Sequence, residues 1–481
     1  MTVHFPFDNT YVRLPARFFT RQMPVPVSAP SLIAVNRPLA ATLGITLPDT
    51  DAAIAALFAG NTVPQGAEPL AQVYAGHQFG GWAPQLGDGR AVMLGEVVAP
   101  NGARFDVQLK GAGHTPYSRM GDGRAWLGPV LREYIVSEAM AAMGIPTTRA
   151  LAAVATGDTV MRESGPLPGA VFTRIAASHI RVGTFQYFAA RQDVQALDHL
   201  TQHSIARHYP GATGPADLLD SVIEAQANLV AKWMGVGFIH GVMNTDNMAI
   251  SGETIDYGPC AFLDAYHPDK VFSSIDHFGR YAYANQPKIA VWNLAQFATT
   301  LLPLMPGKEQ AIEAFTAAVE GFEAKFTTAW HGILRAKLGL AHTEPGDIDL
   351  AFDLLDRMAA NQADFTRTFR ALSDPTPETA RAEFTNPTAF DPWMTAWTKR
   401  ISREGSAAET RISRMQAVNP ARIPRNHRIE ETITAALTGD LAPFNALMQA
   451  LTTPYADDQA FVVYEAAPSD KNRVSQTFCG T

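Results

Sequence analysis

The sequence predicts an α+β fold, because strand signals and helix signals dominate different parts of the chain. Between residues 73 and 176, short apolar runs alternate with glycine-rich turns, and after residue 181 apolar residues recur mostly at helical spacing. Of the 481 residues, 47% are hydrophobic and 17% are charged. This composition is typical of a globular protein with a substantial core.

The strand-rich part predicts a hairpin, then a helix, then two further strands. Asn101-Gly102 is a strong hairpin signal between two apolar runs. Pro129 is a suitable first residue for a helix, and Gly144 lies where that helix would end. The expected strands are residues 91–98, 105–110, 149–155 and 169–176, and the expected helix is 130–143.

The second part predicts helices interrupted by a loop and a short hairpin. Residues 216–234 form a long amphipathic pattern, which a loop at 239–247 follows. Residues 248–255 predict a hairpin, with its turn at residues 251–253. The uncharged stretch 289–306 contains several polar residues, so we expect a buried helix there rather than a membrane span.

Composition excludes several classes of function. The formal net charge of -8 gives the chain no general attraction for nucleic acid or anionic membranes. The only two cysteines, Cys260 and Cys479, exclude a disulfide-rich scaffold and a cysteine-based zinc site. Residues 1–22 lack the continuous apolar core of a secretory signal. We therefore expect a cytoplasmic protein, a monomer, with no nucleic-acid or membrane partner.

A glycine-rich turn and a lysine–glutamate pair suggest a phosphate site. Residues 85–90 (QLGDGR) form a turn whose backbone amides could approach a phosphate group. Lys110 ends a predicted strand and Glu133 lies in the following helix, the arrangement by which protein kinases present a lysine to nucleotide phosphates. Each feature alone is more commonly an ordinary turn or a surface charge, so the inference depends on their order with the motifs below.

Arginines add further phosphate-binding capacity. Arg174 and Arg181 follow residues 122–124 (DGR) along the chain. Guanidinium groups suit phosphate oxygens because they present paired donors in one plane. Taken singly, each arginine would be interpreted as a solvated charge.

The strongest signal is the loop at residues 240–247 (HGVMNTDN), which is followed nine residues after Asn247 by Asp256-Tyr257-Gly258. Protein kinases carry His-Arg-Asp, four residues, Asn, and then Asp-Phe-Gly. Asn247 lies five residues after Val242, as the kinase Asn lies five after its Asp. Asn247 and Asp256 flank the predicted hairpin, so both could supply oxygen ligands to one Mg²⁺ ion. The order of these motifs predicts an ATP- and metal-binding cleft between Lys110 and Asp256.

Two residues depart from the kinase pattern. Val242 stands where kinases have the catalytic aspartate, and valine cannot accept a proton. Asp246 is the nearby acid in the loop and is the candidate base for a substrate hydroxyl. Asp88 lies in the glycine-rich turn, where a carboxylate would repel a triphosphate, so we expect phosphates to lie differently from those in an ordinary kinase.

These motifs resemble the selenoprotein O family of kinase-like protein adenylyltransferases. The resemblance covers nearly the whole chain, and its central motifs are long and specific. The segments that carry it are residues 74–80, 85–90, 108–111, 118–124, 144–150, 181–186, 240–247 and 256–259.

The resemblance implies a two-lobed, protein-kinase-like pseudokinase fold in which ATP binds inverted. The expected divisions are an N-terminal extension at 1–70, an N-terminal lobe at 71–181, the catalytic part of the C-terminal lobe at 182–285, and a helical C-terminal part at 286–481 packed on that lobe. The implied reaction transfers AMP from ATP to Ser, Thr or Tyr hydroxyls of proteins and releases pyrophosphate.

The resemblance also assigns residue roles. Asp246 would be the base, Glu133 would pair with Lys110, and Asn247 and Asp256 would bind Mg²⁺, or Mn²⁺ in its place. The residues expected to hold ATP are Gly87, Gly89, Arg90, Lys110, Asp122, Gly123, Arg174, Arg181 and Asp256. Two alternatives remain open from the residues: a conventional kinase that uses Asp246, and a non-catalytic ATP-binding scaffold.

The cysteines leave a redox role open. Some relatives carry selenocysteine third from the end, where this chain has Cys479, and some pair a C-terminal cysteine with one downstream of the Asp-Tyr-Gly segment. Here that region has Ser273 and Ser274. Cys260 is the remaining candidate partner, and an unpaired terminal thiol is the alternative.

Overall fold

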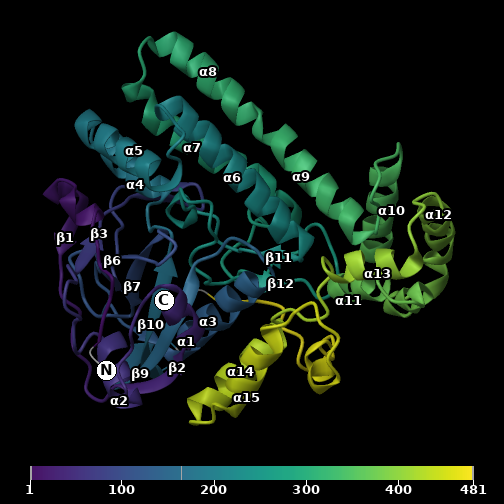
Figure 1. Cartoon of the computed structure of the whole chain (residues 1–481), viewed down its shortest axis with the longest axis horizontal. Coiled ribbons are helices and arrows are strands. Elements are labelled where there is room, and N and C mark those ends of the chain that lie inside the picture. Colours follow the sequence, from purple (N-terminus) through teal and green to yellow (C-terminus); the bar gives the residue numbers. More distant parts are fainter. Residues whose placement is uncertain (1–2, 164, 479–481) are drawn as a thin grey trace.

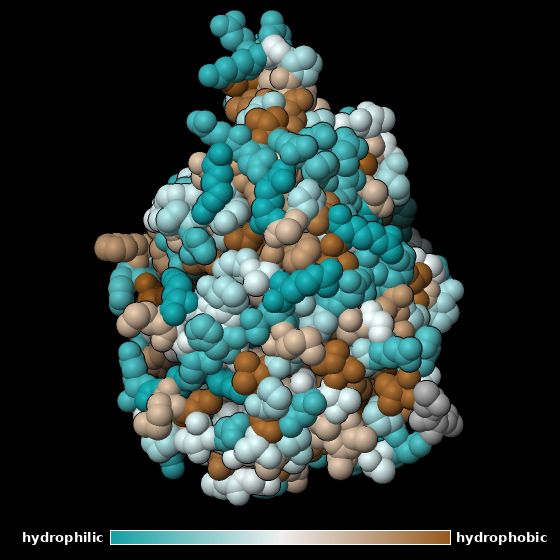
Figure 2. All heavy atoms as spheres, turned by 90° about the vertical axis from the view of Figure 1, so that its left-hand side faces the viewer, coloured by the Kyte–Doolittle hydropathy of each residue, from teal (hydrophilic) through white to brown (hydrophobic). Residues whose placement is uncertain are grey.

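The computed structural model describes residues 3–163 and 165–478, and it combines an N-terminal antiparallel sheet with a largely helical C-terminal half (Figure 1). This confirms the α+β prediction. In Figure 1 the sheet and its covering helices lie on the left, and the long helices α6 to α9 extend across the top. The face in Figure 2 shows hydrophilic and hydrophobic side chains interspersed, without a broad apolar surface.

The sheet is antiparallel in all its pairings, and its strand order is β1-β3-β6-β7-β10-β9-β2, with β8 also pairing with β10. A separate hairpin, β4-β5, follows β3 along the chain. The bounds are β1 (Phe19–Arg21), β2 (Ser31–Val35), β3 (Leu70–Gln72), β4 (Gly76–Gln78), β5 (Gly81–Ala83), β6 (Ala91–Val98), β7 (Arg104–Lys110), β8 (Ala125–Trp126), β9 (Arg149–Arg162) and β10 (Gly165–Ala176).

Strand register places two cations on one face of the sheet. Lys110 of β7 lies opposite Phe172 of β10, and Gln108 lies opposite Arg174. Residues two apart on a strand, and residues directly opposite each other, share a face. Lys110 and Arg174 therefore point to the same side, toward helix α3 (Leu127–Ala142), which packs on β9 and β10.

The sheet separates two hydrophobic cores. Phe172 belongs to a large core that includes α3 and continues into the C-terminal helices. Its neighbour Val171 belongs to a smaller core beneath α2 (Asp51–Phe58), which also contains Phe58. The alternation of the two residues between cores follows from the two-residue period of a strand. Helix α1 (Arg37–Thr42) lies near β9.

The C-terminal half consists mainly of helices. Its α-helices are α4 (Val182–Ala189), α5 (Val194–His208), α6 (Pro215–Gly235), α7 (Gln286–Leu301), α8 (Lys308–Glu320), α9 (Phe322–Lys337), α10 (Asp347–Ala360), α11 (Phe365–Ala371), α12 (Asp391–Ile401), α13 (Ala408–Gln416), α14 (Asn426–Leu437) and α15 (Ala442–Leu451). Two short strands, β11 (Phe238–Ile239) and β12 (Ala261–Phe262), flank the loop that carries the 3-10 turn η3 (Thr245–Asn247). Among the described residues, no helix is both long and apolar enough to cross a membrane. Residues 289–306 lie mostly in α7, as a buried helix requires.

The predicted hairpin at residues 248–255 is wrong. Its two arms do not pair with each other, because Ala249 bridges to Arg181 and Thr254 bridges to Thr147. Each arm therefore attaches to the connection that follows α3 or β10, which ties the loop to the sheet-rich part. Strands β9 and β10 are longer than predicted, and α3 begins at Leu127 rather than near Pro129.

Candidate functional site

One cleft of about 1080 Å³ brings the sheet, the glycine-rich turn and the 240–258 loop together. Glu133 is the one predicted site residue that does not line it, because its side chain lies behind the cleft on α3 and is 2% exposed. The predicted residues that line the cleft are Gly87, Gly89, Arg90, Lys110, Asp122, Gly123, Arg174, Arg181, Asp246, Asn247 and Asp256.

Glu133 anchors two cations at the back of this cleft. Its Oε2 accepts from Lys110 Nζ at 2.6 Å, and its Oε1 accepts from Arg174 Nε at 2.9 Å. Because α3 packs on the face to which both cations point, one buried carboxylate fixes both of them. The lysine–glutamate pair that the sequence predicted is present in the structure.

Asp256 closes this ion cluster from the loop side. Its Oδ1 accepts from Arg174 Nη2 at 3.1 Å and also from Lys110. Desolvation opposes ionisation of Asp256, but Lys110, Arg174 and Arg90 hold the pKa of its carboxyl well below the usual value. Its φ of 66° is unusual for a residue other than glycine, so the surrounding contacts must hold the backbone in this conformation.

The glycines of the cleft allow two loops to approach closely. Gly87 has φ of 105°, and a Cβ there would lie 2.6 Å from Cγ of Tyr117. A Cβ on Gly123 would lie 2.2 Å from the carbonyl oxygen of Gly113. Larger residues at these two positions would push apart the loops that form this wall of the cleft. The carboxylate of nearby Asp122 accepts from Arg162 at 2.8 Å.

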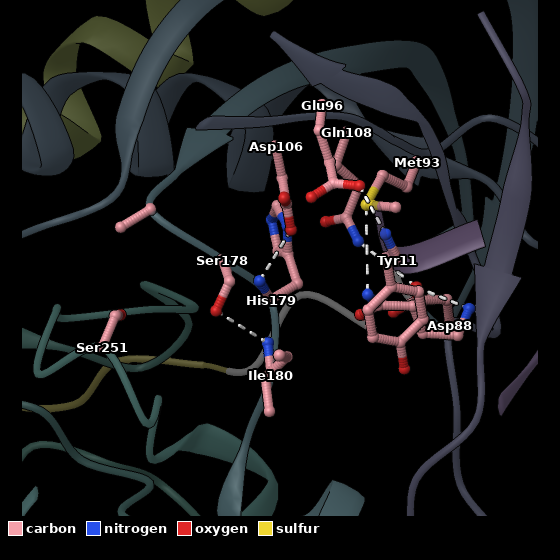
Figure 3. Close-up of polar contacts among 12 residues, drawn as sticks. Tyr11, Asp88, Met93, Glu96, Asp106, Gln108, Ser178, His179, Ile180 and Ser251 are labelled. Atoms are coloured by element: carbon pink, nitrogen blue, oxygen red, sulfur yellow. Dashed lines mark hydrogen bonds and ion pairs between the residues drawn. The ribbon is translucent and has the colours of Figure 1, made fainter. Parts of the chain in front are cut away.

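Asp88 is held inside the protein rather than presented to the cleft as a free anion. It is 2% exposed, and its Oδ2 accepts from the backbone of Gln72 at 3.0 Å and from Gln108 at 3.3 Å. Arg181 Nη1 lies 3.6 Å from its Oδ1. Figure 3 shows Asp88 beside Tyr11. This compensation reduces the repulsion that the Asp88 carboxylate would exert on phosphates in the cleft.

Arg181 is a buried cation with unused donors. Its guanidinium lies 4.3 Å from the ring centroid of Tyr74, and its Nε and Nη1 are buried without hydrogen-bond partners among the described residues. The favourable geometry over the tyrosine ring compensates part of the cost of burying the charge. The unused donors are suited to phosphate oxygens.

Asp246 is a buried acid with one free oxygen. It is 8% exposed, and burial raises the pKa of its carboxyl to about 6, against the opposing influence of Arg181 and Gln78. Gln78 Nε2 donates to its Oδ2 at 3.3 Å. Its Oδ1 is buried with no hydrogen-bond partner from another described residue. A Cβ on Gly76 would lie 2.6 Å from that oxygen, so glycine leaves room beside it.

The hairpin β4-β5 lies against the loop that carries Asp246. The backbone of His77 donates to Thr245 Oγ1 at 2.7 Å, and the backbone of Phe79 donates to Asn244 Oδ1 at 3.0 Å. Sequence reasoning assigned no role to Gln78 or to Asn244. The only signal was that both lie in segments resembling the family.

Asn247 and Asp256 offer oxygen ligands that suit a hard divalent cation. Nδ2 of Asn247 donates to the carbonyl of Val242 at 3.0 Å, which leaves the amide oxygen available as a ligand. The second ligand would be the carboxylate of Asp256, which lines the same cleft. Among the described residues, no group of three or more His, Cys, Asp or Glu could hold a metal ion. Two protein oxygens completed by substrate phosphates and water are the usual protein contribution to a Mg²⁺ site.

A buried polar network fixes the connection between the sheet and the helices (Figure 3). Asp106 Oδ2 accepts from the backbone and the ring Nδ1 of His179, at 2.8 and 3.0 Å, and its Oδ1 accepts from Arg207 at 2.7 Å. Arg207 also pairs with Glu96, which is fully buried and accepts from the backbone of Tyr11 at 2.6 Å. The network holds residues 177–181, and thereby the backbone that leads to Arg181.

The sequence left open whether Cys260 pairs with Cys479 or Cys479 is an unpaired thiol, and Cys479 lies outside the described residues. Cys260 is buried, and burial raises the pKa of its thiol to about 12. A thiol of this kind is a poor nucleophile at neutral pH.

Comparison with known proteins agrees with the motifs. The family described as protein adenylyltransferase SelO matches residues 2–452. The chain belongs to the SelO protein adenylyltransferase family. It is a nucleotidyltransferase of that family. It is 69% identical to the protein nucleotidyltransferase YdiU of Jannaschia sp. (strain CCS1), over 99% of both chains. It is 59% identical to the protein of the same name from Ruegeria pomeroyi, over the full length of both.

Proposed function

We propose that this protein transfers AMP from ATP to Ser, Thr or Tyr hydroxyls of other proteins, releasing pyrophosphate. The observation that carries the proposal is that eleven of the twelve predicted site residues, all except Glu133, line one cleft. The family match supports transfer of an adenylyl group to protein. Family membership alone leaves the acceptor residues open.

A protein-kinase-like, two-lobed arrangement is part of this proposal. The sheet with α3 would be the N-terminal lobe and the helices from α4 onward the C-terminal lobe. The strand lysine held by a helix glutamate, and the Asn247–Asp256 pair on the opposing loop, support it because they occur in kinase order. Val242 in place of a catalytic aspartate supports a pseudokinase that carries out different chemistry.

Asp246 would accept the proton of the acceptor hydroxyl. As the proton moves to the carboxylate, the hydroxyl oxygen attacks the α-phosphorus, and the bond from the α-phosphorus to the bridging oxygen breaks. Pyrophosphate leaves with that oxygen, and the protein acceptor carries AMP. The buried, unpartnered Oδ1 of Asp246 supports this role, because a general base needs a free lone pair within reach of the proton.

The cations of the cleft would bind the triphosphate. Lys110 and Arg174 are positioned by Glu133, and Arg181 has unused donors. Fixed positive groups stabilise charge that develops on phosphate oxygens without reorganising during the reaction. Mg²⁺, or Mn²⁺ in its place, held by Asn247 and Asp256, would supply charge neutralisation on the phosphates.

The test compares ATP labelled on the α-phosphate with ATP labelled on the γ-phosphate, each incubated with the protein, Mg²⁺ and a lysate of cell proteins. Label retained on protein only from the α position is the expected result. Retention only from the γ position would contradict the proposal in favour of a conventional kinase that uses Asp246. Binding of ATP without retention from either position would favour a non-catalytic scaffold.

An Asp256→Ala variant separates chemistry from background labelling. Loss of α-label with an unchanged circular dichroism spectrum is expected, because the variant lacks both a metal ligand and a member of the ion cluster. Mass spectrometry of the labelled proteins would then identify the acceptor residues as Ser, Thr or Tyr.

A further inference from the structure

A second cavity opens beside the nucleotide cleft. It has a volume of about 400 Å³ and shares two lining residues, Phe79 and Ile275, with the larger cleft. None of the residues predicted to hold ATP or metal lines it. Its lining residues are Phe79, Ile275, Asp276, His277, Phe278, Arg280, Asn285, Lys288 and Ile289.

The cavity exposes apolar side chains that nothing in the described chain covers. Phe278 is 99% exposed and Ile275 is 49% exposed. Single exposed apolar residues are normal on a protein surface. Here, however, they line one concavity together with Phe79 and Ile289. Clustered apolar residues around a concavity mark binding sites, and aromatic residues are enriched at their centres.

The same cavity is locally cationic in an acidic protein. Lys288 is exposed and pairs with no described residue, and Arg280 lies 4.9 Å from the ring centroid of Trp292. The cavity's acid, Asp276, is 6% exposed, and its oxygens accept from the backbone amides of Arg280 and Tyr281 at 2.9 and 2.8 Å. With that carboxylate already satisfied, the lining presents a net positive charge.

The loops of this cavity are attached to the loop of the candidate base. Asn244 Oδ1 accepts from the backbone of Phe79 at 3.0 Å and from the hydroxyl of Tyr281 at 2.7 Å. Asn244 precedes Asp246 by two residues and lines the nucleotide cleft. A chain bound in the second cavity would therefore lie next to the position from which a hydroxyl approaches Asp246.

We propose that the second cavity binds the segment of an acceptor protein that flanks the modified hydroxyl, and that it selects an apolar side chain accompanied by an acidic one. This inference rests on the proposed AMP transfer. Phe278 and Ile275 contact the apolar side chain, and Lys288 and Arg280 attract the acid. Charge complementarity of this kind contributes to partner selection more than to total affinity.

The test uses a library of synthetic peptides with one central serine. Each of the five positions on either side is fixed in turn as Leu, Glu, Lys or Gly, and transfer of label from α-labelled ATP is measured. The wild-type protein is expected to favour Leu at one position and Glu at another. In Lys288→Glu, the preference for Glu over Lys should fall by roughly threefold to tenfold, because one attractive charge becomes repulsive.

Matched variants exclude a general loss of activity. Lys308→Glu makes the same charge change on an exposed lysine at the start of α8 and should keep the wild-type preference. Phe278→Ala should raise KM for Leu-containing peptides while kcat stays unchanged. The control variant Phe352→Ala, on α10, should leave KM for these peptides unchanged.

Two results would overturn the inference in distinguishable ways. If the wild-type protein labels peptides and Lys288→Glu and Phe278→Ala show its unchanged preferences, the acceptor-binding role of this cavity is wrong while AMP transfer stands. If the wild-type protein transfers α-label to no peptide and to no protein of a cell lysate, AMP transfer itself is wrong, and the inference fails with it.

Discussion

Gln78 donates a hydrogen bond of 3.3 Å to Asp246 from a position 168 residues earlier in the chain. The bond joins the β4-β5 hairpin to the loop of the candidate base and orients the carboxylate so that its other oxygen stays free. If Asp246 is the base, Gln78 is a positioning residue that acts through it.

Gln78→Ala is expected to lower kcat for AMP transfer by roughly 10- to 100-fold, the effect of losing one hydrogen bond to a charged group. KM for ATP should change little, because the amide contacts the base rather than the phosphate-binding cations. Steady-state kinetics with α-labelled ATP measures both constants. Gln85→Ala is the matched control, since Gln85 is exposed and does not line the cleft. Equal kinetics for the two variants would contradict the positioning role.

The sequence could predict contacts that belong to a known order of motifs, but not contacts made by distant loops. Lys110 and Glu133 were identifiable because a strand lysine followed by a helix glutamate is the arrangement found in protein kinases. Gln78 was not, because no spacing rule relates a hairpin to a loop so far along the chain. The hairpin at 248–255 was mispredicted for the same reason, since its arms bridge to Thr147 and Arg181 rather than to each other.

Glu133→Gln should weaken ATP binding. The carboxylate of Glu133 holds Lys110 and Arg174 together, and a neutral amide leaves Asp256 as the one anion among the described residues that these two like charges share. We expect a higher Kd for ATP, measured by equilibrium binding of a fluorescent ATP analogue. Circular dichroism would verify that the variant remains folded.

Glu138→Gln is the matched control on the same helix. Glu138 accepts from Arg149 at 2.8 Å, away from the cleft. This variant should lose some thermal stability and keep the wild-type Kd for ATP. An equal rise in Kd for both variants would mean that Glu133 acts through general stability alone.

Arg207→Met should destabilise the protein strongly. Arg207 is the cation between Glu96 and Asp106, and all three side chains are at most 5% exposed. Removing one partner of a buried ion pair costs about 3–5 kcal/mol, because the remaining charge is left uncompensated. The melting temperature from differential scanning calorimetry should therefore fall by several degrees.

Arg37→Met is the control for Arg207→Met, because it removes an arginine from an exposed ion pair. The Arg37 and Asp51 side chains are 57% and 74% exposed, so their pairing contributes little. A melting temperature close to that of the wild-type protein is expected. If Arg207→Met also left the melting temperature unchanged, the network would not hold the connection between the sheet and the helices.

We expect Lys337 to make the stability of the folded protein depend on pH, independently of the cleft. The residue is 2% exposed, and burial lowers the pKa of its ammonium group from 10.5 to about 7. Between these two values the unfolded chain carries one more proton than the folded protein. Unfolding free energy therefore rises with pH across that window, and below about pH 7 the full cost of burying the charge remains. The Phe369 ring, with its centroid 4.3 Å from the ammonium nitrogen, compensates part of that cost.

Lys337→Met should raise the melting temperature at pH 7, because an apolar chain of similar length replaces a buried ionisable group. The gain should shrink as the pH approaches 10, because the free-energy cost of removing the lysine's proton on folding falls toward zero near its unfolded-state pKa of 10.5. Lys399→Met, at an exposed position on α12, should give no comparable gain at either pH. A gain for Lys337→Met that stayed constant from pH 7 to pH 10 would show that pH-independent packing of the methionine side chain, rather than titration of the buried ammonium, determines the stability at this position.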